Sequence, residues 1–369
     1  MNFNYLFNFA AEFQEHIRDM LKSKLKILFA LLIFCTTSFI EVKAEHPDKS
    51  NLTEAYDPKP MIMHHVLNAH EWHLFDYKDN EEKSHPVSIP LPIILITEGN
   101  IDVFLSSDFK HGQVAVEKGN RKYILDEHGH IEEVNGASVI DISITKNVAS
   151  MLISVLLLLL LLKSTAKGYK RNKYGPKRIQ AFLEPIILFV RDDIIKANIG
   201  PKHERYTSFL LTVFFFILIN NFMGLVPGSA NVTGNISVTL VLAMFTFVIT
   251  TISGNKNYWK HIFNPPTPLL LMPIMVPIEI FGVFTKPFAL MIRLFANITA
   301  GHITIMSLIS LIFMVQFQSG NGAAFGVAPL SVLFVLFIML IELLVAFLQA
   351  YIFTLLSAVF IGLAVAEDH

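Results

Sequence analysis

Two long apolar runs near the carboxyl end, residues 269–317 and 330–366, constrain the fold of this chain more than any other feature. As helices they would extend about 70 and 55 Å, at about 1.5 Å per residue, whereas the hydrocarbon core of a bilayer is about 30 Å thick. They must therefore tilt steeply, kink or lie partly in the membrane plane. The prolines of the first run predict kinks, at Pro273, Pro277 and Pro287. Gly320-Asn-Gly322 followed by Pro329 predicts the turn between the runs.

An arginine, Arg293, lies in the middle of the first run, which is otherwise long, apolar and helix-forming. A cation at that depth costs about 3 kcal/mol or more, so we expect it to face protein, water or a counter-charge. On a helix, Asn297 lies one turn from Arg293, Gly301 lies two turns away and His302 is close to that face. The alternatives are snorkelling to a headgroup and a structural ion pair. The distance of Arg293 from either end of the run argues against snorkelling.

The second run has two polar residues with long side chains in its middle, Glu342 and Gln349, which are seven apart and share one face. If the two runs fold back antiparallel, residues at one height have numbers with a constant sum. Arg293 with Gln349 gives 642 and His302 with Glu342 gives 644, so both pairs centre on Asn321. The polar groups then form two layers about 10 to 13 Å apart. This geometry suits a proton path, and the alternative for His302 and Glu342 is a static buried ion pair.

The composition excludes several classes of protein. Apolar residues make up 53% of the 369 residues and charged residues 16%, and the mean hydropathy is +0.52, which indicates a polytopic membrane protein rather than a soluble enzyme. No basic patch interleaved with aromatic residues suggests a nucleic-acid partner. Cys35 is the single cysteine, so an intrachain disulfide, a CxxC metal site and redox chemistry are excluded. We predict no metal and no cofactor.

The first 44 residues have the three-part layout of a secretory signal peptide. Residues 22–26 are basic, residues 27–40 are apolar, and Val42-Lys-Ala44 offers small residues before Glu45. Met20 is an alternative start, and an uncleaved anchor is the alternative to a signal. Residues 45–146 are polar and punctuated by glycine, which predicts a small extracytoplasmic domain with β-hairpins and turns at Glu98-Gly-Asn and Glu127-His-Gly-His. Its histidines lack the spacing of a metal site, so we interpret them as solvated surface residues: His64, His65, His70 and His73.

The membrane domain is expected to occupy residues 147–369. Its first span, residues 148–162, precedes seven basic residues that mark the cytoplasmic side: Lys163, Lys167, Lys170, Arg171, Lys173, Lys177 and Arg178. Pro176 then opens an amphipathic helix expected to lie along the inner surface, with apolar residues at helical spacing: Ile179, Phe182, Leu183, Ile186, Val190 and Ile194. The alternative is a soluble amphipathic helix.

We predict a hairpin of two membrane spans at residues 207–226 and 237–253. The basic residues that follow it, Lys256 and Lys260, indicate that the chain is again on the cytoplasmic side. Asn220 and Asn221 could line a polar path or join neighbouring helices. We therefore expect an all-α polytopic protein with five mature crossings, the last two forming a long, tilted antiparallel hairpin. It would span the inner cell membrane, with residues 45–146 in the periplasm and His369 in the cytoplasm.

At these residues the chain strongly resembles subunit a of the F-type ATP synthases, over most of residues 61–369. The matching motifs are Lys286-Pro287, Arg293-Leu294-Phe295-Ala-Asn297, Ala300-Gly301-His302, Glu279 and Leu348-Gln349-Ala350-Tyr351-Ile352-Phe353. Weaker support comes from His64-His65, the basic loop, Asn221 and Ala366-Glu367-Asp368-His369. The set of motifs, in this order, is specific to that family.

The resemblance implies that Arg293 faces the carboxylates of a rotating c-ring of proteolipid subunits. It places Asn297, His302, Glu342 and Gln349 along the outer half-channel, with Asn221 a candidate for its lining, and Glu279 in the inner half-channel. Other implied partners are the stator subunit b, the remaining ATP synthase subunits and the lipid bilayer. Bacterial relatives often carry an acid at the position of His302 and a histidine at that of Glu342. The chain departs from the family pattern in two places. Gly224 stands where some relatives carry an acid, and the outside domain is longer than the short amino-terminal segment usual in the family.

The function expected from the resemblance is a proton-conducting stator subunit that couples proton flow to rotation and is not itself catalytic. No GxxxxGK loop is present, so ATP chemistry must belong to other subunits. The main alternative is a secondary transporter that binds an anionic substrate through Arg293, but the chain has no second copy of the Arg293 segment. A membrane protease would need a nucleophile with a base or a motif such as HExxH, which is absent.

Overall fold

The computed structural model describes residues 68–78 and 84–366, except residues 111, 113, 127–128, 172–178, 227–228 and 269. Several predictions made from the sequence lie outside these residues. They are the signal peptide in residues 1–44, His64 and His65, part of the basic loop, and the terminal residues 367–369.

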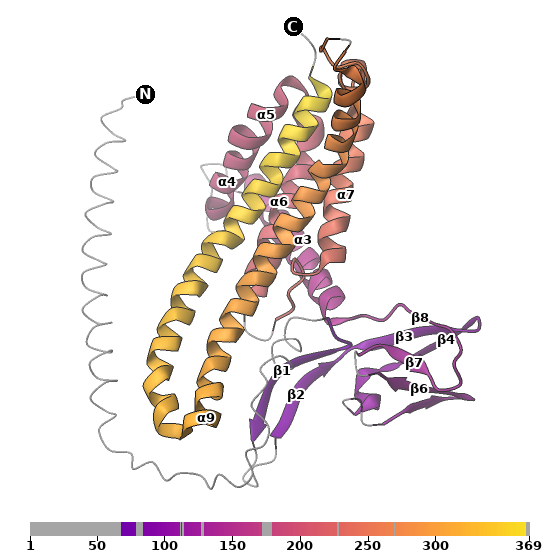
Figure 1. Ribbon diagram of the computed structural model, residues 1–369, viewed down its shortest axis with the longest axis vertical. Helices are drawn as coiled ribbons and strands as arrows, with labels where there is room; N and C mark the ends of the chain where they lie inside the picture. The colour runs from indigo at the N-terminus through magenta and orange to yellow at the C-terminus, as the bar shows by residue number, and fades with distance from the viewer. Residues whose placement is uncertain are drawn as a thin grey trace. The chain divides into compact units, whose positions relative to one another are not determined.

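The amino-terminal part of the described chain forms three small antiparallel sheets (Figure 1). Strands β1 (Glu71–Lys78) and β2 (Ser84–Pro90) form a hairpin. The second sheet has the order β4-β3-β8, with β3 at Pro92–Thr97, β4 at Asn100–Leu105 and β8 at Val139–Asp141. The third has the order β5-β6-β7, with bounds Val116–Lys118, Arg121–Leu125 and Ile131–Glu133, and a short 3-10 helix (Ser106–Phe109) follows β4. The predicted β-structure is confirmed.

The core of this domain lies between the second and third sheets. Side chains of β3 alternate between buried and half-buried, so Ile93 and Leu95 face inward. They pack in one cluster with Phe104, Phe109, Val116, Tyr123 and Ile131. The predicted turn after β3 is also confirmed: Glu98 and Gly99 have φ values of 51° and 82°, the left-handed pair that joins two strands tightly.

His70 is not a solvated surface residue, which corrects the interpretation made from the sequence. Its Nε2 lies 2.6 Å from Asp141 Oδ2, and only 13% of its side chain is exposed. Partial burial would raise the pKa of Asp141, but hydrogen bonds from His70 and Ser143 outweigh it and lower the pKa to about 2. The pairing thus stabilises the domain above the ordinary pKa of an aspartate, and this contribution is lost as the pH falls toward 2. Among the described residues, no three His, Cys, Asp or Glu side chains gather as a metal site.

Four of the described helices are long and apolar enough to cross a membrane. They are α3 (Lys146–Arg171), α6 (Glu204–Gly224), α7 (Ile236–Ser253) and α9 (Met272–Val365). Each covers most of one predicted run, and α9 covers most of two. The chain is therefore a multi-pass membrane protein, mostly helical, with small sheets in its amino-terminal region.

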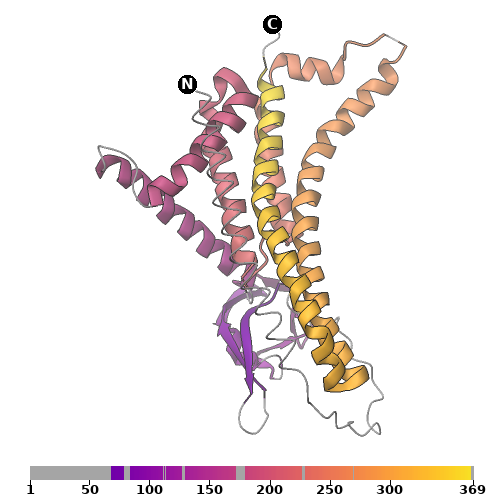
Figure 2. The same cartoon turned by 90° about the vertical axis from the view of Figure 1, so that its left-hand side faces the viewer.

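Helix α9 is two arms rather than one rod, because the backbone at Gly320 is not helical (φ 81°, ψ 176°). The arms run antiparallel: Ser331 Oγ donates a hydrogen bond to Leu308 O, and the arms separate toward their other ends (Figure 2). The predicted hairpin is thus present, but its details differ. The break is confined to Gly320, and the backbone stays helical at Gly322 and Pro329 and through Pro277 and Pro287.

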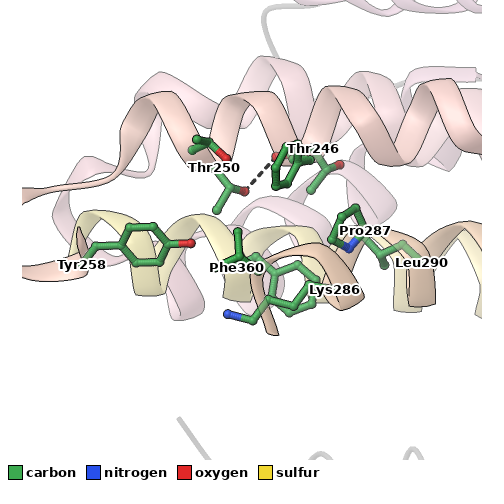
Figure 3. Close-up of a pocket in the computed structure, with 10 residues that line it drawn as sticks. Thr246, Thr250, Tyr258, Lys286, Pro287, Leu290 and Phe360 are labelled. Carbon is green, nitrogen blue, oxygen red and sulfur yellow. Dashed lines mark hydrogen bonds between the residues drawn. The ribbon is translucent and has the colours of Figure 1, made fainter. Parts of the chain in front are cut away.

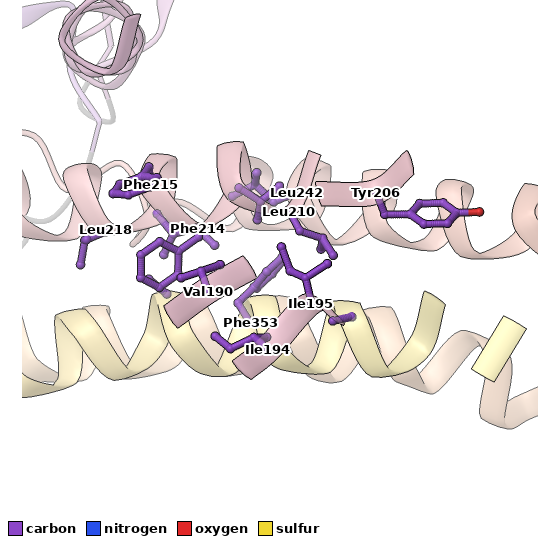
Figure 4. Packing of buried hydrophobic residues seen from close by; sticks show 14 of the residues in the cluster. Val190, Ile194, Ile195, Tyr206, Leu210, Phe214, Phe215, Leu218, Leu242 and Phe353 are labelled. Atoms are coloured by element: carbon purple, nitrogen blue, oxygen red, sulfur yellow. The ribbon is translucent and has the colours of Figure 1, made fainter. Parts of the chain in front are cut away.

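The predicted amphipathic segment becomes helix α4 (Ile179–Phe189), a π-helical stretch η3 (Val190–Lys196) and the short helix α5 (Ala197–Ile199). Leu183, Val190 and Ile194 are buried in a cluster that includes residues of α6 and of the second arm of α9, as Figure 4 shows around Phe214 and Phe353. By contrast, Ile179 and Phe182 are exposed. The apolar face expected for this segment is therefore not uniform. Its first residues are exposed, and its later residues pack against the rest of the protein.

Helix α8 (Lys256–Phe263) follows α7 and closes the carboxyl end of α9. Asn255, just before α8, donates its backbone N–H to Ala364 O at 2.9 Å and its side-chain amide to Val365 O at 2.9 Å. The last carbonyls of a helix lack partners within the helix, so these two bonds cap α9. They also hold the Tyr258 end of α8 close to the second arm.

Candidate functional site

The two arms of α9 bring His302 and Glu342 into contact. His302 Nδ1 lies 3.4 Å from Glu342 Oε1, and the two side chains are 19% and 10% exposed. Gly301 permits this approach, since a Cβ atom at that position would overlap Glu342 Oε1 where it now lies. The pair predicted from the residue numbers is therefore formed, in the order His302 on the first arm and Glu342 on the second.

The loop between α6 and α7 folds back against this pair and supplies polar groups that the sequence reasoning missed. Thr233 and Asn231 are buried, and the Asn231 side-chain nitrogen has no hydrogen-bond partner among the described residues. Thr299, one turn before His302, donates to Gly234 O at 3.4 Å. A Cβ atom at Gly224 would lie 4.0 Å from His302 Nε2, so an acid at that position, as in some relatives, would face the histidine. A run of small and polar residues was the only signal for this loop in the sequence.

Asn221 joins three segments of the chain. Its side-chain nitrogen donates to Ala346 O on the second arm of α9 at 3.0 Å, and its oxygen accepts from Thr233 Oγ1 at 2.7 Å. Asn221 thus ties α6 to the loop and to α9, whereas its neighbour Asn220 donates back to Phe216 O within α6. Of the two interpretations left open for Asn221, the joining role is observed, and the channel-lining role stays a prediction.

Arg293 and Asn297 lie on an exposed side of the first arm. Arg293 takes part in none of the ion pairs found among the described residues. Gln349 is buried on the second arm, and no hydrogen bond joins it to Arg293 in the described part of the chain. The predicted layer of Arg293 and Gln349 is therefore not a bonded pair in the described part of the chain. The Arg293 guanidinium faces outward, and the Gln349 amide faces inward.

Lys286 lines a separate pocket between α7, α8 and the arms of α9 (Figure 3). Figure 3 shows Thr246 and Thr250 on one side of this pocket and Tyr258, Phe360 and Lys286 on the other. Burial raises the pKa of Tyr258, and the negative charge of Glu279 raises it further, which places Glu279 close to the Tyr258 hydroxyl. Lys286 Nζ lies 5.6 Å from the centre of the Phe360 ring. Neither His302 nor Glu342 lines this pocket.

Two family models match the chain. Residues 148–362 match the family described as the ATP synthase A chain, and residues 61–150 match a domain of unknown function, DUF8433. The "ATP synthase subunit a" of Chloroherpeton thalassium is 51% identical over 237 residues, which are 62% of this chain and 69% of that protein. The same-named protein of Myxococcus xanthus is 45% identical over 283 residues, 73% of this chain and 90% of its own length.

The match to the ATP synthase A chain covers the membrane helices described above except for the first residues of α3 and the last residues of α9, and it includes His302 and Glu342. A sequence identity near one half over most of the relatives' length leaves no room for the transporter or protease alternatives. The chain belongs to the family of ATP synthase subunit a, the proton-conducting subunit of the stator, which is not itself catalytic.

Proposed function

We propose that this chain conducts protons through two half-channels that meet at Arg293, and that their flow turns a ring of proteolipid subunits. His302 and Glu342 carry protons in the outer half-channel, with Asn297 and Gln349 beside it and Asn221 in its wall. Glu279 carries protons in the inner half-channel. Arg293 separates the two.

The observation that carries this proposal is the contact of His302 with Glu342 in a membrane-spanning hairpin. An imidazole and a carboxyl group can each bind and release a proton when water reaches them, whereas a pair of purely structural groups needs no such chemistry. The buried side-chain nitrogen of Asn231, which has no partner in the described part of the chain, and the hydroxyl of Thr233 add hydrogen-bonding groups beside the same pair. A proton entering from outside would therefore meet a chain of polar groups rather than hydrocarbon.

Arg293 suits the barrier between the half-channels because it is exposed and forms no ion pair with the described residues of its own chain. A guanidinium stays charged at any working pH, so it favours the ionised form of a carboxylate that passes it. The carboxylate would come from the proteolipid ring, which is the partner proposed for this face. One charge moving through 100 mV releases about 2.3 kcal/mol, so several protons suffice to drive an energy-requiring rotation.

Replacing Glu342 by glutamine tests this proposal. Glutamine keeps the size of the side chain but cannot release a proton, so we expect ATP-driven proton pumping in vesicles carrying the complete complex to fall at least tenfold. The matched control is Glu204→Gln at the exposed start of α6, which should pump normally. Normal pumping by Glu342→Gln, in complexes assembled to the usual level, would contradict the proposed path.

We also propose five crossings, by α3, α6, α7 and the two arms of α9, with residues 68–145 outside and the end of α9 inside. The experiment replaces Cys35 by serine and introduces one cysteine at a time. Asn100→Cys should react with an impermeant thiol reagent in intact spheroplasts, and Lys260→Cys should react only after lysis. The reverse pattern would invert the proposed orientation, and equal labelling of both in intact spheroplasts would contradict an odd number of crossings between them.

A further inference from the structure

One face of the sheet β4-β3-β8 carries only aliphatic side chains. Paired residues of antiparallel strands point to the same side of a sheet, and the register pairs Ile94 with Val103 and Ile96 with both Ile101 and Ile140. Ile142 continues this side, because its N–H donates to Ile94 O at 3.0 Å. We name this set the aliphatic face: Ile94, Ile96, Ile101, Val103, Ile140 and Ile142.

The aliphatic face is open, whereas the opposite face of the same sheet is covered. Ile93, Leu95 and Phe104 are buried in the core against the third sheet. On the aliphatic face, the four residues of β4 and of the β8 segment are between 56% and 66% exposed. A soluble antiparallel sheet normally turns polar residues to its open side, and a contiguous apolar patch marks a surface that is covered in the working state.

The sheet is joined to the first membrane helix without a free linker. The ladder continues past β8 through Ile142 and through Ile144, whose N–H donates to Pro92 O at 3.0 Å, and α3 begins at Lys146. The start of α3 is tied down in turn, since the Lys146 N–H donates to Ala69 O at 2.8 Å. Four residues span at most about 14 Å, so Ile142 lies within that distance of the start of α3.

Two properties of the aliphatic face favour lipid over a protein partner. It contains no tryptophan, tyrosine, methionine or arginine, the residues that dominate the centres of protein interfaces. It also lies close to the start of α3, which is long and apolar enough to cross a membrane and whose side chains at Leu152, Leu156 and Leu160 are themselves exposed, so a second apolar surface begins nearby.

We propose that the aliphatic face rests on the membrane, with its isoleucine and valine side chains among the upper acyl segments of the lipids around α3. The sheet then holds the amino-terminal domain flat against the bilayer. This inference depends on the membrane position of α3 and does not depend on the proton path.

Depth-dependent fluorescence quenching tests the proposal on the full chain, within its complex, in phosphatidylcholine vesicles. In a Cys35→Ser background, Val103→Cys on β4 and Ile140→Cys on β8 each receive an environment-sensitive fluorophore. Glu132→Cys on β7, an exposed position in the third sheet, is the matched control. Some of the phosphatidylcholine carries a nitroxide on the upper part of its acyl chain.

We expect blue-shifted emission at both aliphatic positions and nitroxide quenching at least threefold stronger than at Glu132→Cys. Two positions on different strands are used because a label that disturbs one strand would not reproduce the result on the other. Quenching no stronger than at the control would overturn the proposal. Protection from aqueous iodide without quenching by nitroxide lipid would also overturn it, since it would show a protein partner on this face.

Discussion

Replacing Arg293 by alanine is expected to abolish ATP-driven proton pumping and to allow protons to leak passively between the two half-channels. The fixed cation is the barrier, so without it no charge separates the two aqueous paths and none draws the passing carboxylate into its ionised form. Proton flux in vesicles measures both effects, with the nucleotide-hydrolysing head present for pumping and removed for the leak. Arg293→Lys should couple poorly, because a lysine in a partly dry site can lose its proton and lacks the planar fork of a guanidinium.

The control for this experiment is Arg205→Ala, which removes an exposed arginine at the start of α6 beside Tyr206. That variant should pump normally. If Arg293→Ala pumps as well as Arg205→Ala, the proposed mechanism is wrong, and Arg293 returns to the structural role considered from the sequence.

Exchanging His302 and Glu342 is expected to restore much of the proton flux that either single change removes. His302→Glu places two carboxylates side by side, where one must stay protonated, and Glu342→His places two imidazoles there. The double variant recovers one of each, in the order common among bacterial relatives. Groups in contact couple by about 1 kcal/mol or more, which corresponds to at least a fivefold gain over the product of the two single losses. Strictly multiplicative losses would show that the two groups do not act together.

The hairpin and its polar pair could be predicted from the sequence because residue numbers measure height along two antiparallel helices. A constant sum correctly paired His302 with Glu342. The same arithmetic placed Arg293 opposite Gln349 but could not say which way either side chain points. Arg293 faces outward and Gln349 is buried, because the two residues lie at different angles around their helices.

Features that depend on distant packing could not be predicted. The return of Thr233 against the hairpin is fixed by a hydrogen bond to Asn221, 12 residues earlier, and small polar residues alone do not specify such a path. Likewise, the apolar positions of α4 and η3 share a helical period, but only the positions that meet α6 and α9 are buried. The aliphatic face escaped notice because β3 reads as one continuous apolar run, which hides the alternation between its two faces.

The direct passage of the β8 ladder into α3 also limits how this protein can change in length. One residue inserted between Ile142 and Lys146 would turn the strand over, since side chains alternate from side to side, or would rotate α3 by about 100° relative to the sheet. Exposed turns that join two strands, such as the one between β5 and β6, do not set the phase of a helix. Insertions and deletions should therefore be tolerated at the hairpin tips of this domain and rejected in the four residues before α3, where strand register and helix phase are set together.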